Sequence, residues 1–157
     1  MKVQPHERRI TNIKLASQED LNILRELVEM AEDAYPGIGA WWNKIKSGFK
    51  DGTRQGLLIS NLSREVVGGT VIKVGASAKI CSMRIVEGAR RKRYGQQLWD
   101  ATVDHIRKLG YSRCHFTMPG DIWVQGWFAS QPGVERIGHL TPKTFRRNDI
   151  EEIVCDP

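Results

Sequence analysis

The chain has 157 residues, of which 40% are hydrophobic and 27% are charged, a size and composition that fit one globular domain. No apolar run approaches the ~20 residues that a membrane helix needs, and the first ten residues, MKVQPHERRI, contain no apolar signal segment. The three cysteines are widely spaced and form no CxxC pair, which favours free thiols and gives no metal site. We therefore expect a single cytoplasmic domain, residues 1–157, without a membrane partner.

The net charge of +6 favours polyanions or phosphorylated ligands as partners, although by itself it says nothing about the fold. Much of the excess is local, at Arg8-Arg9, Arg90–Arg93 and Arg146-Arg147. The two outer pairs are typical of a solvated face. The central run differs because a glycine and a helical pattern follow it.

The first half of the chain alternates between strand and helix patterns. Ser17 is a good N-cap for a helix whose apolar face is Leu21, Leu24, Val28 and Ala31, and Pro36-Gly37 ends it. Period-two alternation and turn residues predict the remaining elements. They are a first strand at Arg9–Ala16, a helix at Ala40–Phe49, a hairpin of Gly56–Leu62 and Glu65–Val74, and a strand at Ser77–Glu87.

The second half contains the clearest helix, Gly95–Leu109, which has one apolar face and is ended by Gly110. After it we predict strands at Arg113–Met118, Glu135–Leu140 and Ile150–Cys155, with a short helix from Asp121 to Ser130. The order β-α-α-β-β-β-α-β-α-β-β predicts a mixed α/β fold. Its sheet is expected to be antiparallel at first and parallel across the Gly95 helix.

The segment Lys79 to Trp99, KICSMRIVEGARRKRYGQQLW, is the most informative part of the chain. A strand leads into the loop Arg90–Arg93, and Gly95 then opens the helix. The first turn of a helix has unpaired N–H groups and the positive end of the helix dipole. This arrangement suits a phosphorylated ligand.

The same residues resemble the GNAT superfamily of acyl-CoA-dependent N-acyltransferases. The family motif [RQ]-x-x-G-x-[GA] aligns with Arg90-Arg91-Lys92-Arg93-Tyr94-Gly95, and Ile85 and Glu87 take the places of its preceding V-x-P. The element order matches along nearly the whole chain, and Trp127 to Gly138, WFASQPGVERIG, is similar to the family's YxKxGFxxxG passage. The resemblance implies a mostly antiparallel sheet of about seven strands and about four helices, with splayed strands at the cofactor site.

The resemblance also implies a cofactor, acetyl-CoA, and a set of residues that bind it. Backbone N–H groups from Arg91 to Gln96 would cradle the pyrophosphate, and backbone around Met83 to Ile85 would bind pantetheine and polarise the thioester. One position departs from the family, because Arg93 stands where its first glycine usually lies. The expected cofactor-binding residues are Met83, Arg84, Ile85, Arg90, Arg91, Lys92, Arg93, Tyr94, Gly95 and Gln96.

No residue is assigned a catalytic role with the same clarity. The family's usual general acid is a tyrosine on the helix after the fifth strand, where this chain has Trp123, Trp127 and Phe128. Weak candidates for moving protons are therefore Glu32, Asp33, His115 and Ser130, each of which is more often a solvated or structural residue. The aromatic groups Trp41-Trp42 and Trp123, Trp127 and Phe128 either pack in the core or line an acceptor cleft.

Two functions of different classes remain open. The first is an N-acetyltransferase that transfers an acetyl group from acetyl-CoA to an amine by direct attack, and the acceptor is a small molecule, a protein amine or an aminoacyl-tRNA. The second is a weakly active or inactive GNAT-fold module that is regulatory or binds nucleic acid. The missing tyrosine, Arg93 and the basic charge support this alternative. A homodimer is possible with either function.

Overall fold

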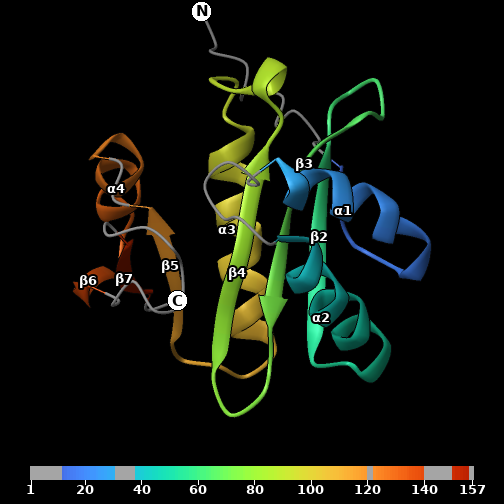
Figure 1. Ribbon diagram of the computed structural model, residues 1–157. Helices are drawn as coiled ribbons and strands as arrows, with labels where there is room; N and C mark the ends of the chain where they lie inside the picture. Colours follow the sequence, from blue (N-terminus) through green and yellow to red (C-terminus); the bar gives the residue numbers. More distant parts are fainter. Residues whose placement is uncertain (1–11, 31–37, 120–121, 140–149, 156–157) are drawn as a thin grey trace, which may run out of the picture.

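The computed structural model describes residues 12–30, 38–119, 122–139 and 150–155. Within these residues, a seven-stranded sheet in the order β1-β2-β3-β4-β5-β7-β6 is flanked by four α-helices (Figure 1). The elements are β1 Asn12–Leu15, α1 Leu21–Glu29, α2 Ile38–Asp51, β2 Arg54–Ser60, β3 Val66–Lys73, β4 Ala78–Ile85, α3 Tyr94–Lys108, β5 Cys114–Pro119, α4 Ile122–Ala129, β6 Val134–His139 and β7 Ile150–Cys155. The predicted fold class is confirmed.

The strand directions also follow the prediction. Strands β1 to β4 pair in sequence order and are antiparallel, whereas β4 and β5 are parallel and are connected through α3. Strand β7 then lies between β5 and β6 and is antiparallel to both. The one parallel junction in the described sheet therefore lies between β4 and β5, and it divides the sheet into two antiparallel parts.

One face of the sheet is covered by α3. Its apolar stripe, which includes Leu98, Trp99 and Ile106, is buried against strand residues such as Ile72 and Ile80. A buried hydroxyl pair also joins this helix to β3, because Thr102 lies 3.5 Å from Thr70 between their hydroxyl oxygens. The periodic apolar pattern that predicted this helix therefore corresponds to its buried face.

The opposite face is covered by α1 and α2. The residues Leu24, Leu27 and Val28 of α1 and Trp42 and Ile45 of α2 are buried, and they pack with Leu58 and Val71 of the sheet. Trp41 is half-buried and packs against the same cluster. The Trp41-Trp42 pair is therefore part of the core packing.

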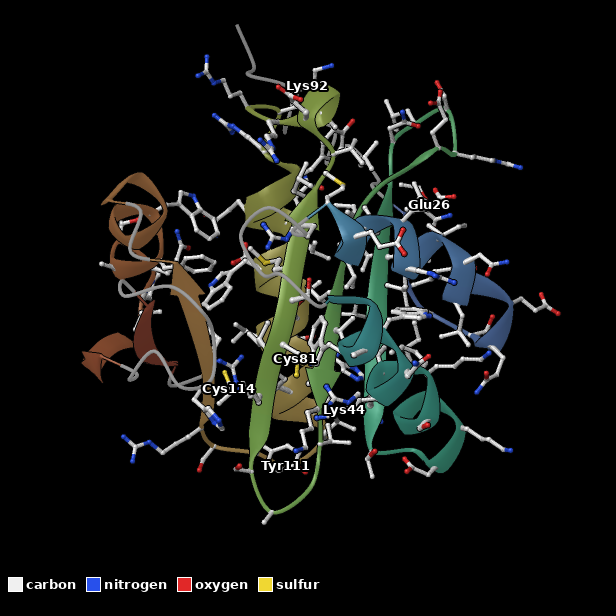
Figure 2. The ribbon with its side chains drawn as sticks, viewed as in Figure 1. Glu26, Lys44, Cys81, Lys92, Tyr111 and Cys114 are labelled. Atoms are coloured by element: carbon white, nitrogen blue, oxygen red, sulfur yellow. The ribbon has the colours of Figure 1, made fainter. Side chains whose placement is uncertain are left out.

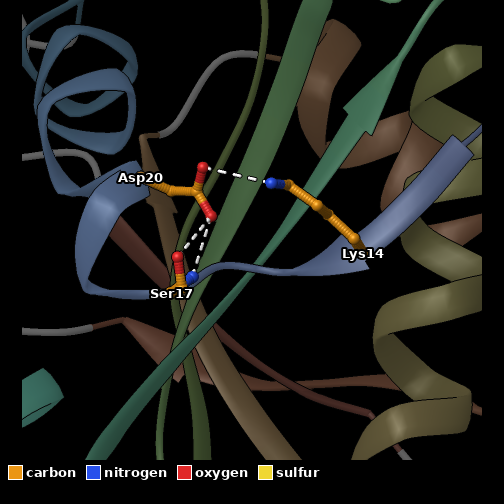
Figure 3. Close-up of polar contacts among 3 residues, drawn as sticks. All are labelled: Lys14, Ser17 and Asp20. Carbon is orange, nitrogen blue, oxygen red and sulfur yellow. Dashed lines mark hydrogen bonds and ion pairs between the residues drawn. The ribbon is translucent and has the colours of Figure 1, made fainter.

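A capping arrangement at Ser17 positions the start of this helical layer, as predicted. The Asp20 carboxylate accepts hydrogen bonds from the Ser17 backbone N–H at 2.8 Å and the Ser17 hydroxyl at 3.1 Å, and it forms an ion pair with Lys14 at 3.2 Å (Figure 3). The backbone hydrogen bond from Ser17 is the main reason that the pKa of Asp20 lies below its usual value. A short 3-10 turn at Gln18–Asp20 then leads into α1.

Several boundaries differ by one or two residues from the predicted ones. Strand β2 begins at Arg54 because Arg54 and Gln55 pair with Lys73 and Ile72, although both are polar. Helix α3 begins at Tyr94, one residue before the predicted glycine. The breaker Pro36-Gly37 and the start of the predicted first strand lie outside the described residues. Among the helices that the structure describes, none has the length and apolar character that crossing a membrane requires.

Candidate functional site

Strands β4 and β5 diverge after a short paired segment. They are joined only at Ala78–Cys114, Lys79–His115 and Ile80–Phe116, although β4 continues to Ile85. Beyond that point β5 pairs with β7 on its other edge, and the two strands separate upwards in Figure 1. In the described part of the sheet, residues 81–85 of β4 therefore have an open edge. The predicted splay is confirmed, and its fork lies at Ile80.

A β-bulge lies directly beyond the fork. Ile72 of β3 pairs with Ile80, but the preceding Val71 pairs with Ser82, so Cys81 is an extra residue in β4. A bulge bends the strand and changes the direction of its backbone groups. The bend occurs where β4 loses its partner, and it contributes to the separation of the two strands.

The backbone groups at the open edge can be assigned from the hydrogen-bonding pattern. The Val86 N–H donates a hydrogen bond to the Val67 oxygen at 2.8 Å, so the backbone groups of Val86 face β3. Because facing alternates along an antiparallel strand, Arg84 also directs its backbone groups toward β3, whereas Met83 and Ile85 direct theirs toward the open edge. The Ile85 oxygen accepts a hydrogen bond from Arg90 Nε at 3.3 Å, as this assignment requires.

The loop after β4 leads to a helix N-terminus. Arg91 and Arg93 have φ values of 63° and 67°, in the left-handed region that favours glycine. Arg93 is the N-cap residue of α3 and makes no side-chain cap hydrogen bond. The first N–H groups of the helix, from Tyr94 to Gln96, have no acceptor within the helix. The loop thus adopts a glycine-like backbone with arginines at both left-handed positions.

The side chains of this loop divide into two groups. Arg90, Arg91, Lys92 and Arg93 are exposed, and Figure 2 shows Lys92 beyond the upper end of β4. Gln96 instead donates hydrogen bonds of 2.9 Å to both Asp100 and the buried Gln131. The Gln96 side chain therefore connects α3 to the segment after α4, so only the backbone N–H of Gln96 is available at the helix end. Gln131, which has no motif signal, was not predicted from the sequence.

Gly95 lies at the same helix end and has open space above its backbone. A Cβ atom added there would approach only Ile85 Cγ1, at 3.9 Å, which is an ordinary contact distance. Packing within the described protein therefore does not require glycine at this position.

Aromatic residues fill the α3 side of the fork. The Trp99 ring centroid lies 5.5 Å from that of Phe116 and 5.2 Å from that of Phe128, and the Trp127 and Phe128 centroids are 4.8 Å apart. All three pairs have edge-to-face geometry, which is favourable for aromatic rings. Trp127 and Phe128 are thus packing residues, and the Trp123 side chain lies outside the described residues.

The structure describes two of the four predicted proton-moving candidates, and these two do not lie together. His115 pairs with Lys79 in the closed part of the β4–β5 ladder, and neighbouring residues Cys114 and Phe116 face the α3 core. The Ser130 hydroxyl donates a hydrogen bond to the Trp127 backbone oxygen at 2.6 Å, at the C-terminal end of α4. The next residue, Gln131, accepts the hydrogen bond from Gln96 at the start of α3. Glu32 and Asp33 lie outside the described residues.

A contact that the sequence did not predict lies on the α1/α2 side of the fork. Arg54, at the start of β2, extends across the sheet and places Nη1 3.3 Å from Cys81 Sγ in β4. Burial raises the pKa of the Cys81 thiol, so the thiol stays neutral at neutral pH. No sequence motif links two residues that are 27 positions apart. Only the strand register brings the guanidinium to the bulge.

Comparisons with solved structures find the same fold in known proteins. A GNAT-family acetyltransferase from Staphylococcus aureus superposes with a TM-score of 0.72 and 15% identity, covering 93% of this chain and 98% of its own. The chain has the GNAT fold. A Thermoplasma acidophilum PaiA N-acetyltransferase in complex with coenzyme A gives a TM-score of 0.68 at 15% identity, covering 93% and 99%.

A third GNAT-fold structure is a spermidine N-acetyltransferase chimera that includes the Vibrio cholerae enzyme. It has a TM-score of 0.73 and 13% identity, and covers 93% of this chain and 95% of its own. Protein-family models and curated sequences give no match. At these identities the likeness establishes the shared fold, while function depends on the residues at the fork.

Proposed function

We propose that the protein is an N-acetyltransferase that uses acetyl-CoA and acts on an amine acceptor. The observation that carries the proposal is the open edge of β4, which leads directly into the basic loop and the N-terminus of α3. One continuous path therefore offers backbone hydrogen-bonding groups and then an anion site. This order matches the chemistry of CoA, in which a pantetheine arm is joined to a pyrophosphate.

The described residues offer groups that suit such a donor. The N–H groups of Tyr94, Gly95 and Gln96 would bind the pyrophosphate at the positive end of the helix dipole, and the exposed Arg90–Arg93 side chains would add charge. Packing of the described residues around Gly95 leaves this helix end accessible to a phosphate. Pantetheine would then extend along the Met83 and Ile85 backbone. Arg84 lies between these two residues, but its own backbone groups face β3 and are not offered to pantetheine.

The reaction at the fork is a direct transfer. The lone pair of a neutral amine forms a bond to the thioester carbonyl carbon, the carbon–sulfur bond breaks, and the sulfur leaves with the electron pair. The amine nitrogen loses a proton and the departing sulfur gains one, so the products are an amide and a free thiol. Backbone N–H groups at the bulged strand suit the carbonyl oxygen as charge develops on it. Water is the proton carrier that this proposal assigns, since the described candidates His115 and Ser130 do not lie together.

Isothermal titration with CoA tests the cofactor part of the proposal. We expect wild-type protein to bind CoA and the double variant Arg90→Ala/Arg91→Ala to bind at least about tenfold more weakly, because charge-assisted phosphate contacts are lost. The matched control is Arg64→Ala/Arg107→Ala, which removes the same charge from exposed positions elsewhere. No binding by wild-type protein, or equal weakening by both variants, would contradict the site.

The transfer itself is measured by thiol release from acetyl-CoA in the presence of an amine panel, with mass spectrometry of the products. We expect an acetylated amine for each thiol that is released. If CoA binds but no amine is acetylated, and RNA binds with a steep loss at high salt, the non-catalytic module is the correct interpretation.

A further inference from the structure

Among the described residues, aromatic packing closes one face of the sheet at the fork. On the α3 face, Phe116 is buried and its ring packs against those of Trp99 and Phe128. An acceptor cannot reach Ile80 and Cys81 through this aromatic packing. The amine must therefore come from the α1/α2 face, on which the Cys81 side chain packs.

That face carries an open pocket of about 440 Å³, which the Arg54 side chain connects to the bulge. The pocket lies between α2 and the ends of β2 and β3, and Arg54 both lines it and contacts Cys81, the residue that follows the fork. Figure 2 shows Lys44 and Cys81 at this lower end of the sheet, away from Lys92. Arg54 is therefore the residue through which a small acceptor in the pocket would be directed toward the place where the thioester is expected. The lining residues are Asn43, Lys44, Ser47, Gly48, Asp51, Thr53, Arg54 and Lys73.

The pocket has a positive charge. Lys44, Arg54 and Lys73 contribute three cations, and Asp51 contributes one carboxylate. The Asp51 carboxylate accepts hydrogen bonds from the Thr53 N–H at 2.9 Å and the Thr53 hydroxyl at 2.6 Å, which lower its pKa and hold it at the end of α2. In the described residues, no ion pair involves the three cations. The neutral Cys81 thiol does not cancel the charge of Arg54 either.

Arg54 is held in position by a specific packing feature. Its alkyl chain lies against Gly48 of α2, where an added Cβ would come within 2.7 Å of Arg54 Cδ and 2.8 Å of Cβ. The glycine therefore leaves room for the arginine to extend beneath the helix. A preorganised guanidinium, with its fork of donors, is well suited to a carboxylate or phosphate.

We propose that the acceptor of the reaction is a small amine that also carries an acidic group, which Arg54 binds with help from Lys73. The acidic group, a carboxylate or a phosphate, anchors the acceptor in the pocket while its amine faces the fork. A polycationic amine is disfavoured by the same charges. This inference rests on the proposed acetyl transfer and defines its substrate class.

The test compares kcat/KM for matched acceptors. The panel contains amino acids against their carboxamides, aminoalkyl phosphates against the corresponding amino alcohols, and spermidine. We expect wild-type protein to prefer the acidic member of a pair by at least about tenfold, and the pair that shows this preference identifies carboxylate or phosphate as the anchor. A preference for the neutral members or for spermidine would overturn the proposal.

Variants locate the preference at the pocket. Arg54→Gln should lower kcat/KM by about tenfold to a hundredfold more for acidic acceptors than for neutral ones, and it should retain CoA affinity. Lys46→Gln, on the exposed side of the same helix, is the control that changes nothing. Lys73→Gln, at an exposed position that cannot disturb folding, should lower the same acidic activity by about threefold.

The outcomes separate the two proposals. If Arg54→Gln and Lys73→Gln reduce all acceptors equally, the anion pocket is wrong and the acetyltransferase stands. If wild-type protein binds no CoA, the proposed function fails and this inference fails with it.

Discussion

The two basic regions near β4 are built in opposite ways. The Arg90–Arg93 loop is contiguous in sequence, exposed, and followed by the open space above Gly95. The Arg54 region is assembled from α2, β2, β3 and β4, is partly buried, and depends on Gly48 for room. The run of charge in the loop therefore offers an exposed site without a fixed direction, whereas the packing against Gly48 fixes the direction of the Arg54 guanidinium. The contrast predicts different responses to the same kinds of substitution.

The largest expected effect concerns Gly48. Replacing it with alanine places a methyl group against the Arg54 side chain near its own backbone, where it cannot easily move aside. We expect Gly48→Ala to lower the free energy of unfolding by about 1–2 kcal/mol, although alanine by itself favours a helix by about 1 kcal/mol. Denaturant unfolding measures the change.

A double variant gives the control for this prediction. In the Arg54→Gly background all the close side-chain atoms of residue 54, including Cβ, are absent, so Gly48→Ala should stabilise the protein by about 1 kcal/mol. If the substitution has the same sign in both backgrounds, Arg54 is not held by Gly48.

Gly95 should behave in the opposite way. Its added methyl group meets only an ordinary contact, so Gly95→Ala should raise the free energy of unfolding by about 1 kcal/mol. CoA affinity should change little, because the family motif accepts alanine at this position. Thermal unfolding and calorimetry on one sample check both statements, and a destabilised Gly95→Ala protein would show that the space above the helix end is not open.

The left-handed arginines give the smallest effect. Arg93→Gly should be more stable than Arg93→Ala by about 0.5–1 kcal/mol, since only glycine adopts this backbone without strain. Arg64, with a φ of 64° in the β2–β3 turn, is a matched control that should show the same difference in stability. Both Arg93 variants should also change CoA affinity, whereas the Arg64 variants should not. Equal stability of the glycine and alanine variants at position 93 would contradict the strain.

The sequence predicted the parts of this molecule that local patterns determine. The Ser17 cap, the apolar face of α3, the order of elements along the chain and the fork all follow from periodicity, turn residues and the family resemblance. The loop was found because Arg90–Arg93 are adjacent, although the left-handed conformation of Arg91 was not foreseen.

The remaining features depend on contacts between distant residues. The Arg54–Cys81 contact requires the register of three strands and a bulge, and no local pattern specifies either. The Gln96–Gln131 hydrogen bond joins two neutral side chains that are 35 positions apart, so neither carries a signal of its own. The role of Trp127 and Phe128, either in the core or at an acceptor cleft, was ambiguous for the same reason. Only their ring contacts with Trp99 show that they are packing residues.

A crystal structure of the protein with CoA tests the central claim most directly. We expect the pyrophosphate at the N–H groups of Tyr94, Gly95 and Gln96, and pantetheine hydrogen-bonded to the Met83 and Ile85 backbone, with its sulfur near the bulge at Cys81. A CoA molecule bound elsewhere, or a β4 edge covered by another strand in the complex, would contradict this interpretation of the fork.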